Sequence, residues 1–275
     1  MERTLDQTQK VLLELLEIFI GICQEYDLTY YLVAGSALGA VKYQGFIPWD
    51  DDIDVTMPRE DYERFLQLAP AKLPQWCFLQ NYKTDPAFPH VFTKLRNSNT
   101  TFIERGMAKL PINHGMYLDI FQMDGYPTQE KQIRKLELQK KLLAWKQYCA
   151  LEGSKNWKVR LRRPIMRMLG YHKRTAKTLA KLDQLISQYT LEDSEIWCCH
   201  GNRQGKLEYA PKWHYGKGMT ATFEGLTVRI PEQIDPYLTQ KYGDWRKDLP
   251  PEQQKSHHGC LVCDAKRPYT EYKKR

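Results

Sequence analysis

Acidic residues stand at alternate positions within residues 47–55, whose sequence is IPWDDDIDV. In an extended strand, side chains alternate between the two faces, so Asp52 and Asp54 are predicted to point the same way while Ile53 turns into the core. Two carboxylates held this close repel each other unless a cation lies between them. Mg²⁺ accepts one or two carboxylate ligands together with phosphate oxygens of a substrate. The spacing therefore predicts a Mg²⁺ site for phosphoryl or nucleotidyl transfer, with Mn²⁺ as the alternative ion.

A Gly-Ser pair, Gly35 and Ser36, precedes this acidic segment and follows the apolar run YYLVA at residues 30–34. We predict a strand over that run, a turn at the pair and a short helix near residues 37–43. Backbone N–H groups at such a turn, and the Ser36 hydroxyl, are donors for phosphate oxygens. The pair is therefore predicted to hold the phosphates beside the cation.

Three basic side chains are predicted to assist at the phosphates. Lys42 lies between the Gly-Ser pair and the acidic segment, and Lys94 and Arg96 alternate on one face of a strand predicted over residues 91–96. A plain surface role stays open for each of the three.

The elements that must position these residues follow from periodicity and turn signals. A helix is predicted over residues 4–25, and Pro58 opens another that ends near residue 68, because proline suits a first helical turn. The acidic strand is predicted over residues 52–57. Further β-like runs cover residues 76–82, 91–96, 101–104 and 116–123. This order predicts an α+β fold, with a mixed β-sheet flanked by helices.

The chain is predicted to have three parts. Residues 1–127 form the catalytic core, and residues 128–190 form a helical basic region with breaks at Gly153 and Pro164. Residues 191–275 form a small C-terminal α/β region that completes the catalytic domain and contains a hairpin signal, Glu224-Gly225.

The net charge of +8 indicates an anionic partner. Basic residues are dense between Lys155 and Lys181, where apolar side chains are interleaved with them. Such a stretch can lie on an anionic bilayer, as a peripheral membrane contact, or form a helical hairpin with a solvated basic face. No long uncharged apolar run and no signal-peptide pattern is present. We therefore expect a cytoplasmic protein, at the inner face of the membrane if the basic stretch binds lipid.

Seven cysteines, an odd number, are expected to be free thiols in a reducing compartment. Cys260 and Cys263 follow His257 and His258 at a spacing that can hold zinc. A second pair at finger spacing does not accompany them, so free thiols are favoured and zinc is the alternative.

Four segments together resemble the LicD family: Gly35-Ser36, FIPWDDDID at residues 46–54, YLDIF at residues 117–121 and YGDW at residues 242–245. That family includes bacterial phosphocholine transferases and is similar to the fukutin-type ribitol-phosphate transferases. The resemblance covers most of the chain and is least specific in the helical middle. It implies a nucleotidyltransferase-like fold, in which a Gly-Ser turn holds phosphate, two strand carboxylates bind metal and a neighbouring strand supplies a third carboxylate.

By this resemblance, Asp52 and Asp54 are the metal pair and also catalytic residues. Asp50 either faces the site or supports the loop, whereas Asp51 points the other way in an ideal strand and is assigned no role.

Asp119 is predicted as the third metal-binding acid and as a catalytic residue. An aspartate between Leu118 and Ile120 is costly in a buried strand unless a cation or hydrogen-bond partners compensate. Asp124 is the alternative, but it precedes Gly125 and suits a turn.

The resemblance implies transfer of phosphocholine, or a similar phospho-alcohol, from CDP-choline or a related CDP-alcohol. The acceptor is then a hydroxyl of a lipid-linked glycan precursor of teichoic acid or lipopolysaccharide, and CMP is released. A nucleotidyltransferase with an NTP donor and a sugar-phosphate acceptor is the alternative. A non-catalytic nucleic-acid-binding module is disfavoured, because the aspartates would repel a phosphate backbone. Aromatic residues that can cage a choline head are Tyr43, Trp49, Tyr117, Tyr242 and Trp245.

Overall fold

The main sheet has the strand order β1-β2-β6-β4-β3 in the computed structural model of this chain, which describes residues 5–148, 157–168, 170, 174–200, 209–255 and 259–272. Its strands are β1 (Tyr31–Leu32), β2 (Asp54–Pro58), β3 (Cys77–Gln80), β4 (Thr93–Asn97) and β6 (Met116–Tyr126). β2 and β6 are parallel, and the other neighbours along this path are antiparallel. The predicted α+β class and mixed sheet are confirmed.

β6 is the central strand, and every one of its residues is buried. Its side chains alternate between two cores, as strand geometry requires. Leu118 and Ile120 belong to the core that contains Leu15, Leu16 and Phe19 of α1 (Gln7–Glu25). Phe121 and Met123 belong to a second core with residues of α2 (Ala34–Tyr43) and α8 (Ile234–Tyr242). A long strand buried on both faces explains the apolar sequence on either side of Asp119.

The two helices predicted around the acidic segment are present. Asp6 caps α1, because its carboxylate accepts a hydrogen bond from the Gln9 amide at 2.8 Å and the Gln9 side chain accepts one from the Asp6 amide. α3 (Arg59–Leu68) begins directly after Pro58. β2 begins at Asp54, two residues later than predicted, so Asp52 and Ile53 precede the strand.

The C-terminal part contributes to the same sheet. β7 (Ile196–Cys198) pairs with the end of β6, and β8 (Tyr209–Pro211) pairs with β7. β11 (Cys260–Asp264) pairs with β5 (Thr101–Glu104) in a separate two-stranded sheet, and α7 (Lys212–Tyr215) precedes the β9–β10 hairpin. These pairings agree with a C-terminal region that completes one domain, although the predicted three-part division itself stays a prediction.

The predicted hairpin is confirmed as β9 (Met219–Phe223) and β10 (Leu226–Ile230). Glu224 and Gly225 both have positive φ, 47° and 83°, which is the requirement of a two-residue I′ turn. Short 3₁₀ helices occur at Ala69–Ala71, Pro251–Gln253 and Tyr269–Glu271.

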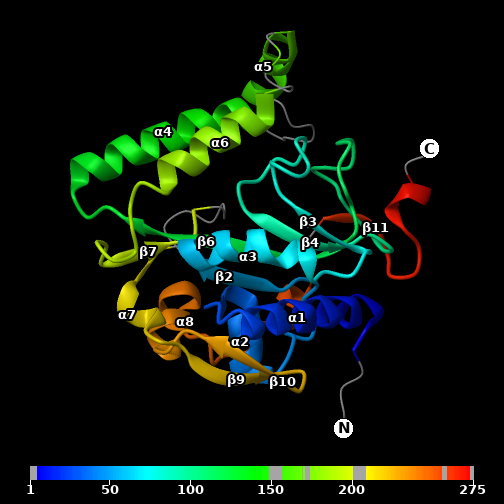
Figure 1. Cartoon of the computed structure of the whole chain (residues 1–275), viewed down its shortest axis with the longest axis vertical. Coiled ribbons are helices and arrows are strands. Elements are labelled where there is room, and N and C mark those ends of the chain that lie inside the picture. The colour runs from blue at the N-terminus through cyan, green and yellow to red at the C-terminus, as the bar shows by residue number, and fades with distance from the viewer. Residues whose placement is uncertain are drawn as a thin grey trace.

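The helical middle lies beyond one side of the sheet, where α4 (Glu130–Tyr148) packs beside α6 (Thr175–Ile186) and α5 (Trp157–Met168) projects past them (Figure 1). The predicted break at Pro164 is wrong, because α5 continues through this proline. Gly153 lies outside the described residues. Among the residues that the structure describes, no helix combines the length and apolarity that a bilayer crossing needs.

Candidate active site

The strand register brings four polar residues into one row across the sheet. Asp54 of β2 pairs with Asp119 of β6, Asp119 pairs with Lys94 of β4, and Lys94 pairs with Gln80 of β3. Paired residues on neighbouring strands project from the same face of a sheet. The structure therefore places Asp54 and Asp119, both predicted metal ligands, side by side.

Asp119 and Lys94 form a buried ion pair. The Lys94 Nζ lies 2.9 Å from Asp119 Oδ1 and 3.2 Å from Oδ2, and the two residues are only 3% and 7% exposed. Burial raises the pKa of Asp119, and the charge and hydrogen bond of Lys94 oppose that rise. In this row, the negative charge of Asp119 is therefore balanced by the positive charge of Lys94.

Arg96, two residues further along β4, is fully enclosed by protein. Its Nε donates to Gln80 Oε1, its Nη1 donates to the Gly115 carbonyl, and its Nη2 lies 3.8 Å from Glu104 Oε2. These contacts give Arg96 a role in holding strands β3 and β4 beneath the row. Its predicted contact with a substrate phosphate stays a prediction.

Lys42 is engaged by the C-terminal segment. Its Nζ donates to the carbonyls of Trp245, Arg246 and Lys247 and lies 2.9 Å from Asp248 Oδ1. The structure therefore uses Lys42 to fasten the segment after α8 to α2. A phosphate contact by Lys42 also stays a prediction.

The loop before β2 carries a second group of acids. Carboxylate oxygens of Asp50, Asp51 and Asp52 lie within 4.8 Å of one another, and all three residues are half-buried. The assignment of Asp51 to the opposite face is wrong, because strand alternation applies only from Asp54 onward and the loop turns all three carboxylates together. Asp51 is therefore a candidate ligand that the sequence interpretation left out.

The start of α2 holds this loop in place. The Asp54 amide donates to Ser36 Oγ at 2.9 Å, and the Asp50 carboxylate lies against the Cα of Gly35. Gly35 and Ser36 lie in the first turn of α2, so the predicted turn before the helix is wrong by three residues. Their backbone N–H groups are at a helix N-terminus, which is a setting that favours anions.

Tyr117 links the loop acids to the row. Burial raises its pKa well above the usual value, and the charges of Glu104, Asp119 and Asp52 raise it further. Asp52 therefore acts on the same side chain as Asp119. The Lys94 Nζ lies 3.1 Å from the centroid of the Tyr117 ring, and the Arg96 guanidinium carbon lies 4.8 Å from it. Cations of the protein thus lie over the ring where the choline head would lie in an aromatic cage.

The donor atoms suit a hard divalent cation. The loop supplies three carboxylates close enough to share an ion, and Asp54 and Asp119 supply two more from adjacent strands. Oxygen-only donor sets favour Mg²⁺ and Mn²⁺ over softer metals. The residues present therefore fit the predicted ion, with Asp50 and Asp51 as ligands additional to those predicted.

We expect Gly35→Ala to lower kcat/KM for the predicted phosphoryl or nucleotidyl transfer roughly 10- to 100-fold, because small displacements of catalytic groups have effects of this size. A Cβ at this position would lie 2.9 Å from Asp50 Oδ2, so the carboxylate must move. Gly21→Ala is the matched control, since a Cβ there meets nothing within 4 Å. Melting temperatures of both variants show whether each is folded. Equal activity of the two folded variants would show that the position of the Asp50 carboxylate does not affect the reaction.

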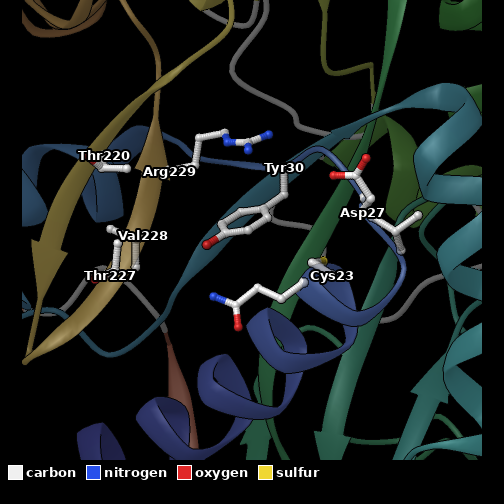
Figure 2. A pocket seen from close by; sticks show the side chains of 9 residues that line it. Cys23, Asp27, Tyr30, Thr220, Thr227, Val228 and Arg229 are labelled. Carbon is white, nitrogen blue, oxygen red and sulfur yellow. The ribbon is translucent and has the colours of Figure 1, made fainter.

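Figure 2 shows a cavity whose lining contains none of these acids. It has a volume of about 300 Å³ and is formed by the end of α1, residues 27–30 and the β9–β10 hairpin, with Tyr30 and Arg229 in its wall. None of the predicted site residues lines it.

Cys260 and Cys263 are free thiols in the structure. A hydrogen bond from Cys260 lowers the pKa of Cys263 to about 6, and Thr8 Oγ1 lies 3.3 Å from its sulfur. His257 and His258 lie outside the described residues, so the zinc alternative remains open.

Comparison with known proteins places this geometry in a family. Residues 27–142 match the family model described as LicD/FKTN/FKRP, nucleotidyltransferase domain. The lipopolysaccharide cholinephosphotransferase LicD of Haemophilus influenzae is 28% identical over 261 residues, which cover 93% of this chain and 96% of that protein. Uncharacterized proteins of Rickettsia typhi and Rickettsia prowazekii are 43% and 41% identical over 44 residues, 16% of this chain. The row of Asp54, Asp119 and Lys94, and the loop acids, lie within the segment that matches the LicD family model.

Proposed function

We propose that this protein is a phosphotransferase that moves phosphocholine from CDP-choline to a hydroxyl of a lipopolysaccharide precursor and releases CMP. The observation that carries the proposal is the juxtaposition of Asp54 and Asp119 on adjacent strands beside the three loop acids and the start of α2. The Haemophilus relative, which aligns over nearly the whole chain, supports phosphocholine as the group and lipopolysaccharide as the acceptor. A teichoic acid precursor is the second acceptor to test.

Binding of the donor is assigned to the first turn of α2 and the acids. Backbone N–H groups at Gly35 and Ser36 would donate to phosphate oxygens, and Asp52, Asp54 and Asp119 would hold Mg²⁺, assisted by Asp50 and Asp51. When bound, Mg²⁺ neutralises charge on the diphosphate that would otherwise repel the incoming hydroxyl. This arrangement is also the basis for proposing a nucleotidyltransferase-like fold.

We assign to Asp119 the role of general base, which accepts the proton of the acceptor hydroxyl. Burial raises the pKa of Asp119 and so strengthens this carboxylate as a base, while the charge of Lys94 opposes the rise. Lys94, at 2.9 Å, keeps the carboxylate oriented and balances its charge before the transfer. Asp119 therefore has two assigned roles, as a ligand of the cation and as the acceptor of this proton, and the remaining acids would contribute to the cation alone.

A second candidate is nucleotidyl transfer from an NTP, because the matched family model is described as a nucleotidyltransferase domain. The acidic site serves both reactions, since both place a nucleotide phosphate beside a divalent cation. The products differ: CMP from the first reaction and pyrophosphate from the second.

The test is product analysis with a panel of donors. Purified protein is incubated with CDP-choline, CDP-ribitol, CDP-glycerol or NTPs, with Mg²⁺ or with EDTA, and with a lipopolysaccharide or teichoic acid precursor. We expect CMP and phosphocholine-modified lipopolysaccharide precursor from CDP-choline, and only when Mg²⁺ is present. Pyrophosphate from an NTP, with no turnover of any CDP-alcohol, would replace the proposal with its alternative.

A location at the cytoplasmic face of the membrane is part of the proposal, because CDP-alcohols are cytoplasmic and the acceptor is built on a lipid carrier. Cell fractionation with a membrane wash at high salt tests this location. Protein recovered from the periplasm or the culture medium, rather than from the cytoplasm or the membrane fraction, would contradict this location.

A further inference from the structure

We propose that helix α5 docks the protein on an anionic phospholipid bilayer, lying in the plane of the interface with its apolar side among the lipids. The proposal concerns binding, goes beyond the reaction, and holds whether or not the donor is CDP-choline.

The apolar side of α5 is exposed. Trp157, Leu161, Ile165 and Met168 are 67%, 70%, 56% and 81% exposed, respectively. Their spacing of four, four and three residues places them along one side of an α-helix. In a soluble protein an apolar stripe of this kind normally packs against the core. Here it is turned to the surroundings, as in helices that lie in a membrane interface.

The charge around this stripe has one sign. Residues 155–181 contain ten lysines and arginines and no aspartate or glutamate. Because the whole chain has a net charge of +8, the rest of the chain is net negative. The basic residues within α5 itself are Lys158, Arg160, Arg162, Arg163 and Arg167. Clusters of this size are attracted by the negative surface potential of anionic lipids.

The position of α5 leaves it accessible to a large flat partner. It projects beyond α4 and α6 at one extremity of the molecule, away from the sheet that carries the acids (Figure 1). α4 adds two further exposed apolar residues, Leu138 and Leu142, which are 60% and 51% exposed.

A bilayer satisfies both features of α5, whereas other partners satisfy one. Nucleic acid would contact the basic residues but would leave Trp157, Leu161, Ile165 and Met168 in water. A second copy of the chain would cover the apolar stripe but would bring two strongly basic segments together. Anionic lipid accepts the apolar side chains and neutralises the charge at the same surface.

The experiment is co-sedimentation of the full chain with phosphatidylcholine vesicles that contain or lack phosphatidylglycerol. We expect binding to the anionic vesicles, and at least about tenfold weaker binding by the double variant Leu161→Ser/Ile165→Ser, which keeps every charge. A charge variant, Arg163→Gln/Arg167→Gln, should weaken binding to anionic vesicles and make the remaining binding less sensitive to salt.

The control is Leu249→Ser/Leu261→Ser, which removes two exposed leucines (44% and 52% exposed) elsewhere on the surface. Circular dichroism shows that each variant is folded, and gel filtration without vesicles reports self-association. Equal loss of vesicle binding in the control and the α5 variant would overturn the proposal. So would absence of vesicle binding by the wild type, or a dimer that only the α5 variant abolishes. No donor or acceptor is present, so the result is independent of the proposed reaction.

Discussion

Asp54→Asn is expected to lower kcat/KM for phosphocholine transfer roughly 10²- to 10³-fold, the size of effect seen when one preorganised electrostatic group is removed from an active site. The substitution keeps the shape of the side chain and removes its charge. Asp54 pairs with Asp119 in the β2–β6 register, and its amide, which donates to Ser36, is unchanged by the substitution. The melting temperature should therefore change little while the reaction slows.

Asp27→Asn is the matched control for this prediction. Asp27 is exposed and has φ of 51°, a left-handed conformation that asparagine accepts readily. The charge change is the same, and the residue lies outside the candidate site. Turnover by Asp54→Asn that equals turnover by Asp27→Asn would remove Asp54 from the active site.

Asp124→Asn is expected to destabilise the protein by about 3–5 kcal/mol, the usual cost of breaking a buried ion pair by removing one partner. The Asp124 side chain is 1% exposed, and its two oxygens accept hydrogen bonds from Arg59 Nε and Nη2 at 2.7 and 2.6 Å. Burial raises the pKa of Asp124, and Arg59 opposes this rise. The same guanidinium donates to Asp183 at 2.8 Å, so one arginine joins α3, β6 and α6.

Chemical denaturation followed by circular dichroism measures this effect. Glu130→Gln is the control, because it breaks an exposed pair with Arg134 (side chains 78% and 77% exposed) and should cost less than about 1 kcal/mol. The double variant Arg59→Met/Asp124→Leu should recover much of the loss, since it leaves no buried charge unpaired between these two positions. Equal costs for Asp124→Asn and Glu130→Gln would show that the buried pair between Arg59 and Asp124 does not hold α3 to β6.

Local patterns predicted most of the elements, because the signals are carried by neighbouring residues. The Glu224-Gly225 turn, the helix that begins after Pro58 and the strand Thr101–Glu104 all appear where the sequence places them. The start of α2 was misplaced because its cause is distant: the Ala34 amide donates to the Tyr237 hydroxyl, 203 residues away. This contact supports a helix that begins at Ala34, whereas the Gly-Ser pair taken alone predicts a turn there.

The candidate site was predictable in residue type and less so in geometry. Asp119 was identified because a charged residue stood in a buried run, and the β2–β6 register places it beside Asp54. The register itself depends on which strands meet, and no local pattern contains that information. Asp51 was missed for a related reason, since strand alternation was assumed two residues before the strand begins.

The roles of the basic residues depended most on tertiary structure. Lys42 fastens the segment after α8, and Lys94 pairs with Asp119, although both were predicted to face substrate phosphates. Long cationic side chains reach several partners from one backbone position, so sequence spacing does not select among them.

Direct Mn²⁺ binding, followed by electron paramagnetic resonance, is the most direct test that these acids hold a divalent cation. Mn²⁺ is titrated into the wild type, Asp52→Asn, Asp54→Asn and the control Asp27→Asn, with and without CDP-choline. We expect saturable binding by the wild type and the control, and Kd values at least about tenfold higher for Asp52→Asn and Asp54→Asn. Binding that is unchanged in both active-site variants, or absent from the wild type even with CDP-choline, would contradict the assignment of the metal site.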